Sequence, residues 1–355
     1  MSIVDCSHFH FDKNSVRICI VGVGALGSSV LQLLADEGYP NVDVIDMDIV
    51  ELDNLGFQLL FEENDIGKKK TDVVLQRLFG SSDLPNHRSF ACSVQSLPLN
   101  QLLSYNIILG CVDNLEARSY INSIVVNQGQ EKIVYIDGGS MGLGGQAHLI
   151  IPSVTPCFQC LYALFPDPST ELYPLCTIVS HPVLPEHCIT YAKQILWEKK
   201  RPNEPFDTEN EEHIQWIYHE ALERSLEFGI EGVTVQLTRR VAKNVIITHP
   251  ETNYRIAQFM LEFVNELVNA ERIESNYVIY RGEEGEYVER FWMEIDSDCP
   301  VCGVHPSRIT LSVHSSSLLQ EVIDLVSKQI NHPFSLWMGT TPLFADVVKT
   351  IRVYP

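Results

Sequence analysis

A glycine-rich turn near the start of the chain has the residue types and spacing that bind a nucleotide phosphate. The segment Gly22-Val23-Gly24-Ala25-Leu26-Gly27 matches G-x-G-x-x-G, whose glycines let the backbone approach a phosphate. A helix that begins here would add free N–H groups and a favourable dipole. Asp46 follows after about twenty residues, the spacing of a carboxylate that binds ribose hydroxyls. By themselves these residues favour an NAD or FAD oxidoreductase, with a purely structural turn as the alternative.

The residues after Asp46 favour ATP instead of a redox cofactor. An acidic stretch, Asp46 to Glu51 with Asp48 inside it, is followed by the triplet Lys68-Lys69-Lys70. Hydride transfer needs no lysine at this place. An adenylating enzyme does, because it must neutralise phosphate charge as pyrophosphate leaves. We take Lys70 as the candidate, and a solvated surface lysine is the alternative.

Asp113 is a candidate for magnesium. It follows an expected buried strand at 107–112, and ligands of open α/β sheets bind at the carboxyl ends of strands. A carboxylate there is a suitable ligand for Mg²⁺. The alternative role is a helix N-cap for the segment that begins at Leu115.

Four cysteines form two C-x-x-C pairs, and a fifth stands alone. The pairs Cys157/Cys160 and Cys299/Cys302 together predict a tetrahedral structural zinc site, which would join the middle of the chain to its end. A redox pair is the alternative, but neither pair follows a thioredoxin-like βαβ start. Cys176 is flanked by residues that suit a helix start, where a thiol becomes a nucleophile. A buried structural cysteine is the alternative there.

The elements that must position these residues read as a parallel, doubly wound α/β sheet. Apolar runs at 16–21 and 42–48 enclose a helical pattern at 25–37, which makes a βαβ unit. Further strands are expected at 107–112 and 133–136. Frequent prolines between 157 and 205 interrupt this repeat. Beyond them we expect helices at 214–228, 256–268 and 316–329, and a strand at 308–313.

Composition bounds the partners and the compartment. The 355 residues include 46 Asp and Glu against 25 Lys and Arg, a net charge of −21. This disfavours nucleic acid or an anionic membrane as the main partner and suits a protein with a basic surface. No apolar run reaches the ~18 residues of a membrane helix, and no signal peptide is evident. We therefore expect a cytoplasmic or nuclear protein whose cysteines are thiols, metal ligands or a nucleophile.

Taken together, the motifs resemble the activating enzymes of ubiquitin-like proteins, and among them the catalytic subunits of heterodimeric neddylation-type enzymes. Bacterial sulfur-carrier adenylating enzymes of the ThiF/MoeB type share the nucleotide motifs, whereas 184–189 and 213–217 point to the neddylation type. The segments that carry the resemblance are 22–27, 46–58, 65–70, 113–118, 136–139, both Cys pairs, 175–178, 184–189 and 213–217.

The resemblance implies a fold and a domain order. A Rossmann-like adenylation domain would span 1–175 and return at 246–304 with the second Cys pair. A mainly helical catalytic-cysteine domain would be inserted at 176–245. Residues 305–355 would form a short or incomplete ubiquitin-fold (β-grasp) module.

The resemblance also implies an ATP-dependent ligase reaction with Mg²⁺ and structural Zn²⁺. The carboxylate of a ubiquitin-like modifier would form an acyl-adenylate and then a thioester on Cys176, for transfer to a conjugating enzyme. A regulatory pseudo-subunit would complete the heterodimer. The implied nucleotide residues are Gly22, Gly24, Gly27, Asp46, Asp48, Asn54, Gln58 and Lys70, with Asp113 on Mg²⁺ and Cys157, Cys160, Cys299 and Cys302 on Zn²⁺.

One departure from the family pattern concerns the nucleotide site. The family has an arginine between Asn-Leu and Gln, and this chain has Phe57. A phenyl ring cannot donate a hydrogen bond to a phosphate. Lys68, Lys69 or an arginine of the partner would have to compensate. The alternatives are a sulfur-carrier adenylyltransferase, which would need no insertion, and a degenerate scaffold subunit that does not adenylate.

Overall fold

The computed structural model describes most of the chain between residues 11 and 345. The described residues are 11–55, 57–80, 83–84, 86–129, 132–164, 175–208, 210–243, 248–282, 285–304, 314, 317–329, 335–338 and 341–345.

The main sheet of the described residues has nine strands in the order β3-β4-β2-β1-β5-β6-β7-β8-β9. Its strands are β1 (Ile18–Val21), β2 (Val42–Ile45), β3 (Asp83–Leu84), β4 (His87–Phe90), β5 (Ile107–Gly110), β6 (Val134–Met141), β7 (Gly144–Ile150), β8 (Tyr277–Arg281) and β9 (Tyr287–Phe291). β4, β2, β1, β5 and β6 run parallel. β3 and β7 to β9 are antiparallel to their neighbours. The sheet is therefore mixed, whereas the sequence predicted a parallel sheet and, of its strands, only β1, β2, β5 and β6.

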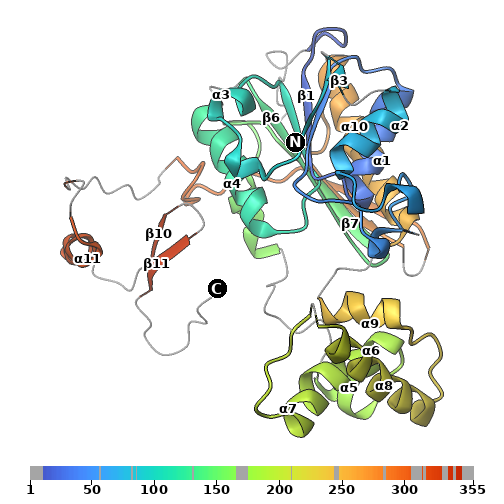
Figure 1. Ribbon diagram of the computed structural model, residues 1–355. Coiled ribbons are helices and arrows are strands. Elements are labelled where there is room, and N and C mark those ends of the chain that lie inside the picture. The colour runs from blue at the N-terminus through green and yellow to red at the C-terminus, as the bar shows by residue number, and fades with distance from the viewer. Residues whose placement is uncertain are drawn as a thin grey trace.

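Helices cover both faces of this sheet (Figure 1). One face carries α1 (Ala25–Asp36), α2 (Lys70–Phe79) and α10 (Pro250–Val268), and the other carries α3 (Leu99–Leu102) and α4 (Leu115–Gln128). Short helical turns lie at Leu52–Asn54, Glu63–Asp65, Val94–Ser96 and Phe158–Leu164. The central strands are mostly apolar, as expected for strands that are covered on both faces, although β2 and β6 each contain a buried aspartate, Asp43 and Asp137.

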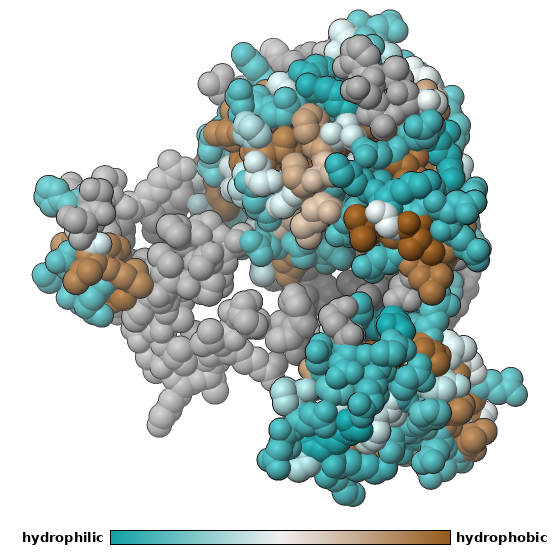
Figure 2. Space-filling model, viewed as in Figure 1, coloured by the Kyte–Doolittle hydropathy of each residue, from teal (hydrophilic) through white to brown (hydrophobic). Residues whose placement is uncertain are grey.

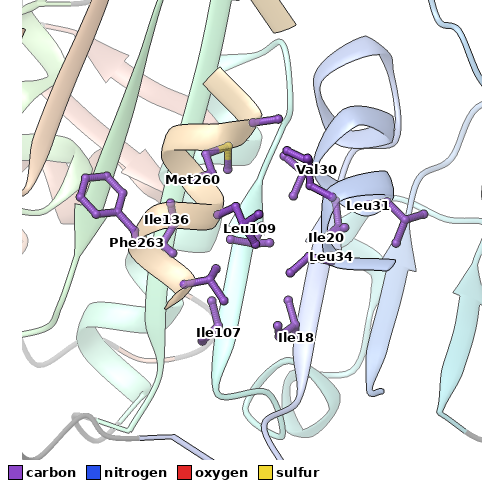
Figure 3. Close-up of a cluster of buried hydrophobic side chains, with 14 of the residues drawn as sticks. Ile18, Ile20, Val30, Leu31, Leu34, Ile107, Leu109, Ile136, Met260 and Phe263 are labelled. Atoms are coloured by element: carbon purple, nitrogen blue, oxygen red, sulfur yellow. The ribbon is translucent and has the colours of Figure 1, made fainter. Parts of the chain in front are cut away.

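The hydrophobic core between the sheet, α1 and α10 fixes the position of the glycine turn at residues 22–27. Ile20 of β1 lies against Val30 and Leu34 of α1, and Met260 of α10 closes the cluster over β6 (Figure 3). A side chain on Gly138 would begin 2.3 Å from the Met260 sulfur, so a glycine lets α10 approach β6. Burial of each of these aliphatic side chains stabilises the folded chain by about 1.5–3 kcal/mol.

A second, helical module has its own core. It comprises α5 (Leu175–Ser180), α6 (Pro185–Tyr191), a π-helical turn (Ala192–Leu196), α7 (Trp197–Lys200), α8 (Glu211–Phe228) and α9 (Val235–Ala242). Cys188, Trp197 and Ile217 are buried together at its centre. The Asn210 side chain caps α8 by accepting from the N–H of Glu212, and Gly229, at φ +66°, ends the helix. The expected helix at 214–228 is thus confirmed. The domain boundaries at 176 and 245 stay predictions, because 165–174 and 244–247 lie outside the described residues.

Near its C-terminal end the chain forms α11 (Leu319–Ser327) and an antiparallel pair, β10 (Ser335–Met338) and β11 (Thr341–Ala345). α11 agrees with the helix expected at 316–329. The strand expected at 308–313 lies outside the described residues, so the β-grasp module stays a prediction. Across the described part of the chain, every helix is too short or too polar to span a bilayer.

Candidate active site

The glycine turn lies at the carboxyl edge of the parallel strands and opens α1. Gly22 has φ +88°, and a Cβ there would meet the Cys111 carbonyl oxygen at 2.7 Å. A Cβ on Gly27 would lie 1.8 Å from the Gly22 oxygen. These two glycines are needed for packing, since only glycine fits. A Cβ on Gly24 would instead meet nothing closer than 3.9 Å, so Gly24 leaves open space at the N-terminus of α1. That space is where a phosphate would bind.

Asp46, directly after β2, holds the glycine turn in place. Its carboxylate accepts hydrogen bonds from the backbone N–H of Val23 at 2.7 Å and of Asp48 at 2.9 Å. Burial raises the pKa of Asp46, and the nearby Lys70 ammonium opposes that rise. Asp46 therefore shapes the glycine turn as well as standing at the position expected for a ribose ligand.

Lys70 and Asp48 meet in a cavity of about 310 Å³ beside this edge, and its lining residues are Met47, Asp48, Ile49, Glu51, Asn54 and Lys70. Lys70 is 6% exposed, and its Nζ donates to Asp48 at 2.9 Å. A backbone bond from the N–H of Lys70 to the Asp48 carbonyl, 3.1 Å, fixes the approach. The alternative interpretation of Lys70, as a solvated surface lysine, is thus wrong.

The predicted nucleotide residues do not all line this cavity. Asp48, Asn54 and Lys70 line it, whereas the glycines, Asp46, Gln58 and Asp113 are not among its lining residues. Gln58 is buried, with its amide nitrogen beside Gly24, and its Oε1 has no hydrogen-bond partner among the described residues. An unpaired buried amide oxygen is costly, which suggests a ligand donor at this place.

Asp113 is exposed and lies between β5 and α4. The N-cap of α4 is Asn114, whose Oδ1 accepts from the N–H of Ala117 at 2.8 Å. The alternative role of Asp113 as the cap is therefore wrong. Its carboxylate remains at the strand end where a metal ligand is expected.

A buried ion pair that the sequence reasoning gave no role supports this loop. Arg118 donates to Asp137 at 2.7 Å and, through Nε and Nη2, to the carbonyl of Val112 at 3.2 and 2.8 Å. Asp137 is fully buried on β6. The guanidinium thus fixes the peptide immediately before Asp113. The sequence contains one signal that could have indicated this ion pair: Asp137 continues the apolar run of β6 and precedes two glycines.

The two Cys pairs meet, as their spacing predicted. The Cys157 and Cys299 sulfurs lie 3.7 Å apart and those of Cys160 and Cys302 3.2 Å apart, and all four lie within 4.8 Å of one another. Sulfurs around a tetrahedral zinc lie about 3.8 Å apart, so the cluster is compatible with zinc. The neighbouring Cys157 and Cys302 side chains lower the pKa of Cys160, whereas contacts within the cluster and burial raise the pKa of Cys157 and of Cys302.

Cys176 is the second residue of α5, in the helical module. Only its backbone belongs to the described part of the structure. The end of the helix is anchored from α8 by Arg224, whose Nη2 donates to the carbonyls of Ile178 and Val179 at 2.8 and 2.6 Å. Cys188 on α6 is fully buried, and burial raises its pKa, which agrees with a structural thiol.

Comparison with known proteins identifies relatives over most of the chain. A family model described as the ThiF family matches residues 12–350. The chain is 36% identical over 336 residues to the NEDD8-activating enzyme E1 catalytic subunit of Arabidopsis thaliana, covering 90% of this chain and 71% of that protein. The protein of the same name in Drosophila melanogaster is 34% identical over 333 residues, covering 90% and 73%.

A solved structure shares the fold. MccB of E. coli with ATP superposes with a TM-score of 0.51 at 18% identity, covering 82% of this chain and 68% of that one. Because the identity is low, the likeness concerns the fold alone. It agrees with the adenylation fold expected from the nucleotide motifs.

Proposed function

The chain belongs to the ThiF family, and from that premise we propose that it is the catalytic subunit of an enzyme that activates a NEDD8-type ubiquitin-like modifier. The observation that carries the proposal is the buried Lys70 in the cavity beside the glycine turn. A buried cation next to an open helix N-terminus suits a polyphosphate, and hydride transfer would not use it.

In the first step, a modifier carboxylate oxygen attacks the α-phosphorus of ATP. The new P–O bond gives an acyl-adenylate, and the bond to the β-phosphate breaks to release pyrophosphate. Gly24 admits the phosphates to the N–H groups that open α1. Lys70 moves its charge from Asp48 toward the developing negative charge of the leaving group.

Asp113 fits a magnesium site, because its carboxylate is exposed at the strand end and is not used as a cap. Mg²⁺ bound there would neutralise phosphate charge. Arg118 keeps the preceding peptide in place. The four clustered cysteines would hold a structural zinc, joining residues 157–160 to 299–302.

In the second step, the Cys176 thiolate attacks the acyl carbon of the adenylate. A thioester bond forms, the bond to the AMP phosphate oxygen breaks and AMP leaves. The acyl group then passes to a cysteine of a conjugating enzyme. Each stage exchanges one activated acyl bond for another, so no redox cofactor takes part.

The segment 47–66, which supplies most of the cavity lining, suits a protein partner. Five large apolar side chains between residues 47 and 66 are exposed: Met47, Ile49, Leu52, Leu59 and Ile66. The face of the molecule drawn in Figure 2 is mostly hydrophilic, with apolar patches on the α/β body. Clustered exposed apolar residues mark interaction surfaces, and we infer that the regulatory subunit covers this segment.

The test is ATP–pyrophosphate exchange with the modifier and the partner subunit present. We expect exchange that requires both proteins. Cys176→Ala should keep exchange and lose the thioester that a reducing agent cleaves, while Cys92→Ala, a half-buried cysteine of the α/β body, should keep both. Absence of exchange with both proteins present would overturn the proposal. A thioester that persists in Cys176→Ala would assign the nucleophile elsewhere.

A further inference from the structure

Residue 57 lies between two parts of the candidate nucleotide site. Asn54 lines the cavity, and the amide nitrogen of Gln58 lies 3.9 Å from the point where a side chain on Gly24 would begin. Phe57 itself offers a phosphate no hydrogen bond. An anion in this site must therefore find its cations on other residues.

Two of the three lysines in this segment carry charges that carboxylates already offset, and the third, Lys69, is exposed to solvent. Lys70 is paired with Asp48 at 2.9 Å, and Lys68 is paired with Asp65 at 3.0 Å. Glu51 adds a further carboxylate to the cavity lining. In a chain of net charge −21, a triphosphate at this place needs additional positive charge.

Arg240 brings a guanidinium to this position from the other module. Its Cζ lies 4.4 Å from the centre of the Phe57 ring, which is cation–π geometry. Arg240 belongs to α9, the labelled helix of the helical module that lies nearest the α/β body in Figure 1. The guanidinium of Arg240 therefore lies on the face of the Phe57 ring. Position 57 is the one at which the family pattern has an arginine of its own.

We propose that Arg240 supplies positive charge to the phosphates of the bound nucleotide, so that the helical module contributes a ligand to the adenylation site. This rests on the proposed function, because it takes ATP as the ligand. Phe57 then acts as a positioning residue that holds the guanidinium at the edge of the site. The nucleotide in turn helps to hold α9 against the α/β body, since both contacts use one side chain.

Direct binding of labelled ATP with Mg²⁺ to the full chain tests the proposal. Arg240→Ala and Arg240→Gln should weaken the Kd for ATP at least about tenfold, the expected loss for a hydrogen bond to a charged group. Arg239→Ala is the matched control on the same helix, because Arg239 is paired with Glu211 at 2.7 Å. It should change the Kd less than about twofold, as a surface pair does.

A second variant separates charge from simple docking. Phe57→Arg places a guanidinium in the segment itself, and Phe57→Arg with Arg240→Ala should recover most of the lost affinity. A docking role predicts the opposite, because both halves of the contact are then gone. Wild-type Kd in Arg240→Ala and Arg240→Gln, or a double variant as weak as Arg240→Ala, would overturn the proposal.

The binding assay also keeps this proposal distinct from the proposed function. It uses neither modifier nor exchange, so Arg240-dependent ATP binding without modifier-dependent exchange would overturn the function alone. Normal exchange with Arg240-independent ATP binding would overturn the role of Arg240 alone. A wild-type chain that binds no ATP would overturn both.

Discussion

Glu266 on α10 is a carboxyl whose protonation is linked to folding. It is partly buried, and burial raises its pKa to about 7, assisted by the neighbouring Glu262 and Glu271 and opposed by Arg290. Its Oε2 has no hydrogen-bond partner among the described residues. The folded chain thus binds a proton that the unfolded chain, with the ordinary value of 4.5, releases at lower pH.

This linkage has a definite sign. Because the folded state binds more protons between pH 4.5 and about 7, the free energy of unfolding decreases as pH rises through that range. Glu266→Gln should remove the decrease and be the more stable protein at about pH 8. Melting temperatures of both proteins across this range are the measurement, with Glu251→Gln, an exposed glutamate at the other end of α10, as the control. An identical pH profile in wild type and Glu266→Gln would contradict the prediction.

Single residues were predictable where their signal was local. The spacing of the glycines, and of the two cysteines within each C-x-x-C pair, is such a local signal. The meeting of the two pairs, 142 residues apart, was predicted from the ligand chemistry of zinc. The Arg118–Asp137 pair and the Arg240–Phe57 contact join residues far apart in the chain, and no spacing rule indicates such partners. The sequence could not decide whether Asp113 caps α4, because Asn114 next to it is an equally good N-cap. The structure shows that Asn114 is the cap.

At the level of elements, burial on both faces decided what could be predicted. β1 and β5 are fully buried apolar runs, and these give a strong signal. β9 is exposed or half-buried along its length, so it lacks an apolar run. β7 to β9 extend the sheet from one side and were not predicted. Exposure explains this for β9 alone, because β7 and β8 are largely buried. The helices at 214–228 and 256–268 were predicted from periodicity, and each begins a few residues earlier than expected.

Arg224 is the element-scale support of the helix that carries Cys176. It bonds the last carbonyls of α5, and its Cζ lies 3.6 Å from the Tyr191 ring centre. A cation at a helix C-terminus also stabilises its dipole. Arg224 therefore fixes the end of a six-residue helix.

Arg224→Ala should slow thioester formation about tenfold and leave ATP–pyrophosphate exchange nearly unchanged, because a small displacement of a nucleophile is costly. Arg201→Ala is a suitable control, since Arg201 stacks on Trp197 and Trp216 in the same module. Single-turnover thioester assays measure the effect. Equal loss of both activities would show general unfolding, and no loss would show that α5 needs no anchor.

On the scale of the whole molecule, the cysteine cluster links two segments that lie outside the sheet, 157–160 and 299–302. Cys157 and Cys299 are buried among the side chains beneath α4, together with Phe158. A Cβ on Gly303 would lie 2.5 Å from the Ser297 carbonyl, so the second pair sits in a tight loop that only glycine closes. This loop follows β9, the last strand of the sheet, and precedes the C-terminal elements. A metal there would hold the end of the adenylation domain against its middle.

We expect one tightly bound zinc per chain, and its removal should lower stability throughout the α/β body. Cys302→Ser should lose the metal and lower the melting temperature, because apo thiols replace a bonded cross-link with weak contacts. Cys92→Ser, outside the cluster, should keep the metal and the melting temperature. Elemental analysis of the purified protein and thermal unfolding before and after chelation measure both. A metal-free chain with the wild-type melting temperature would contradict the prediction, since the close sulfurs would then be held by packing alone.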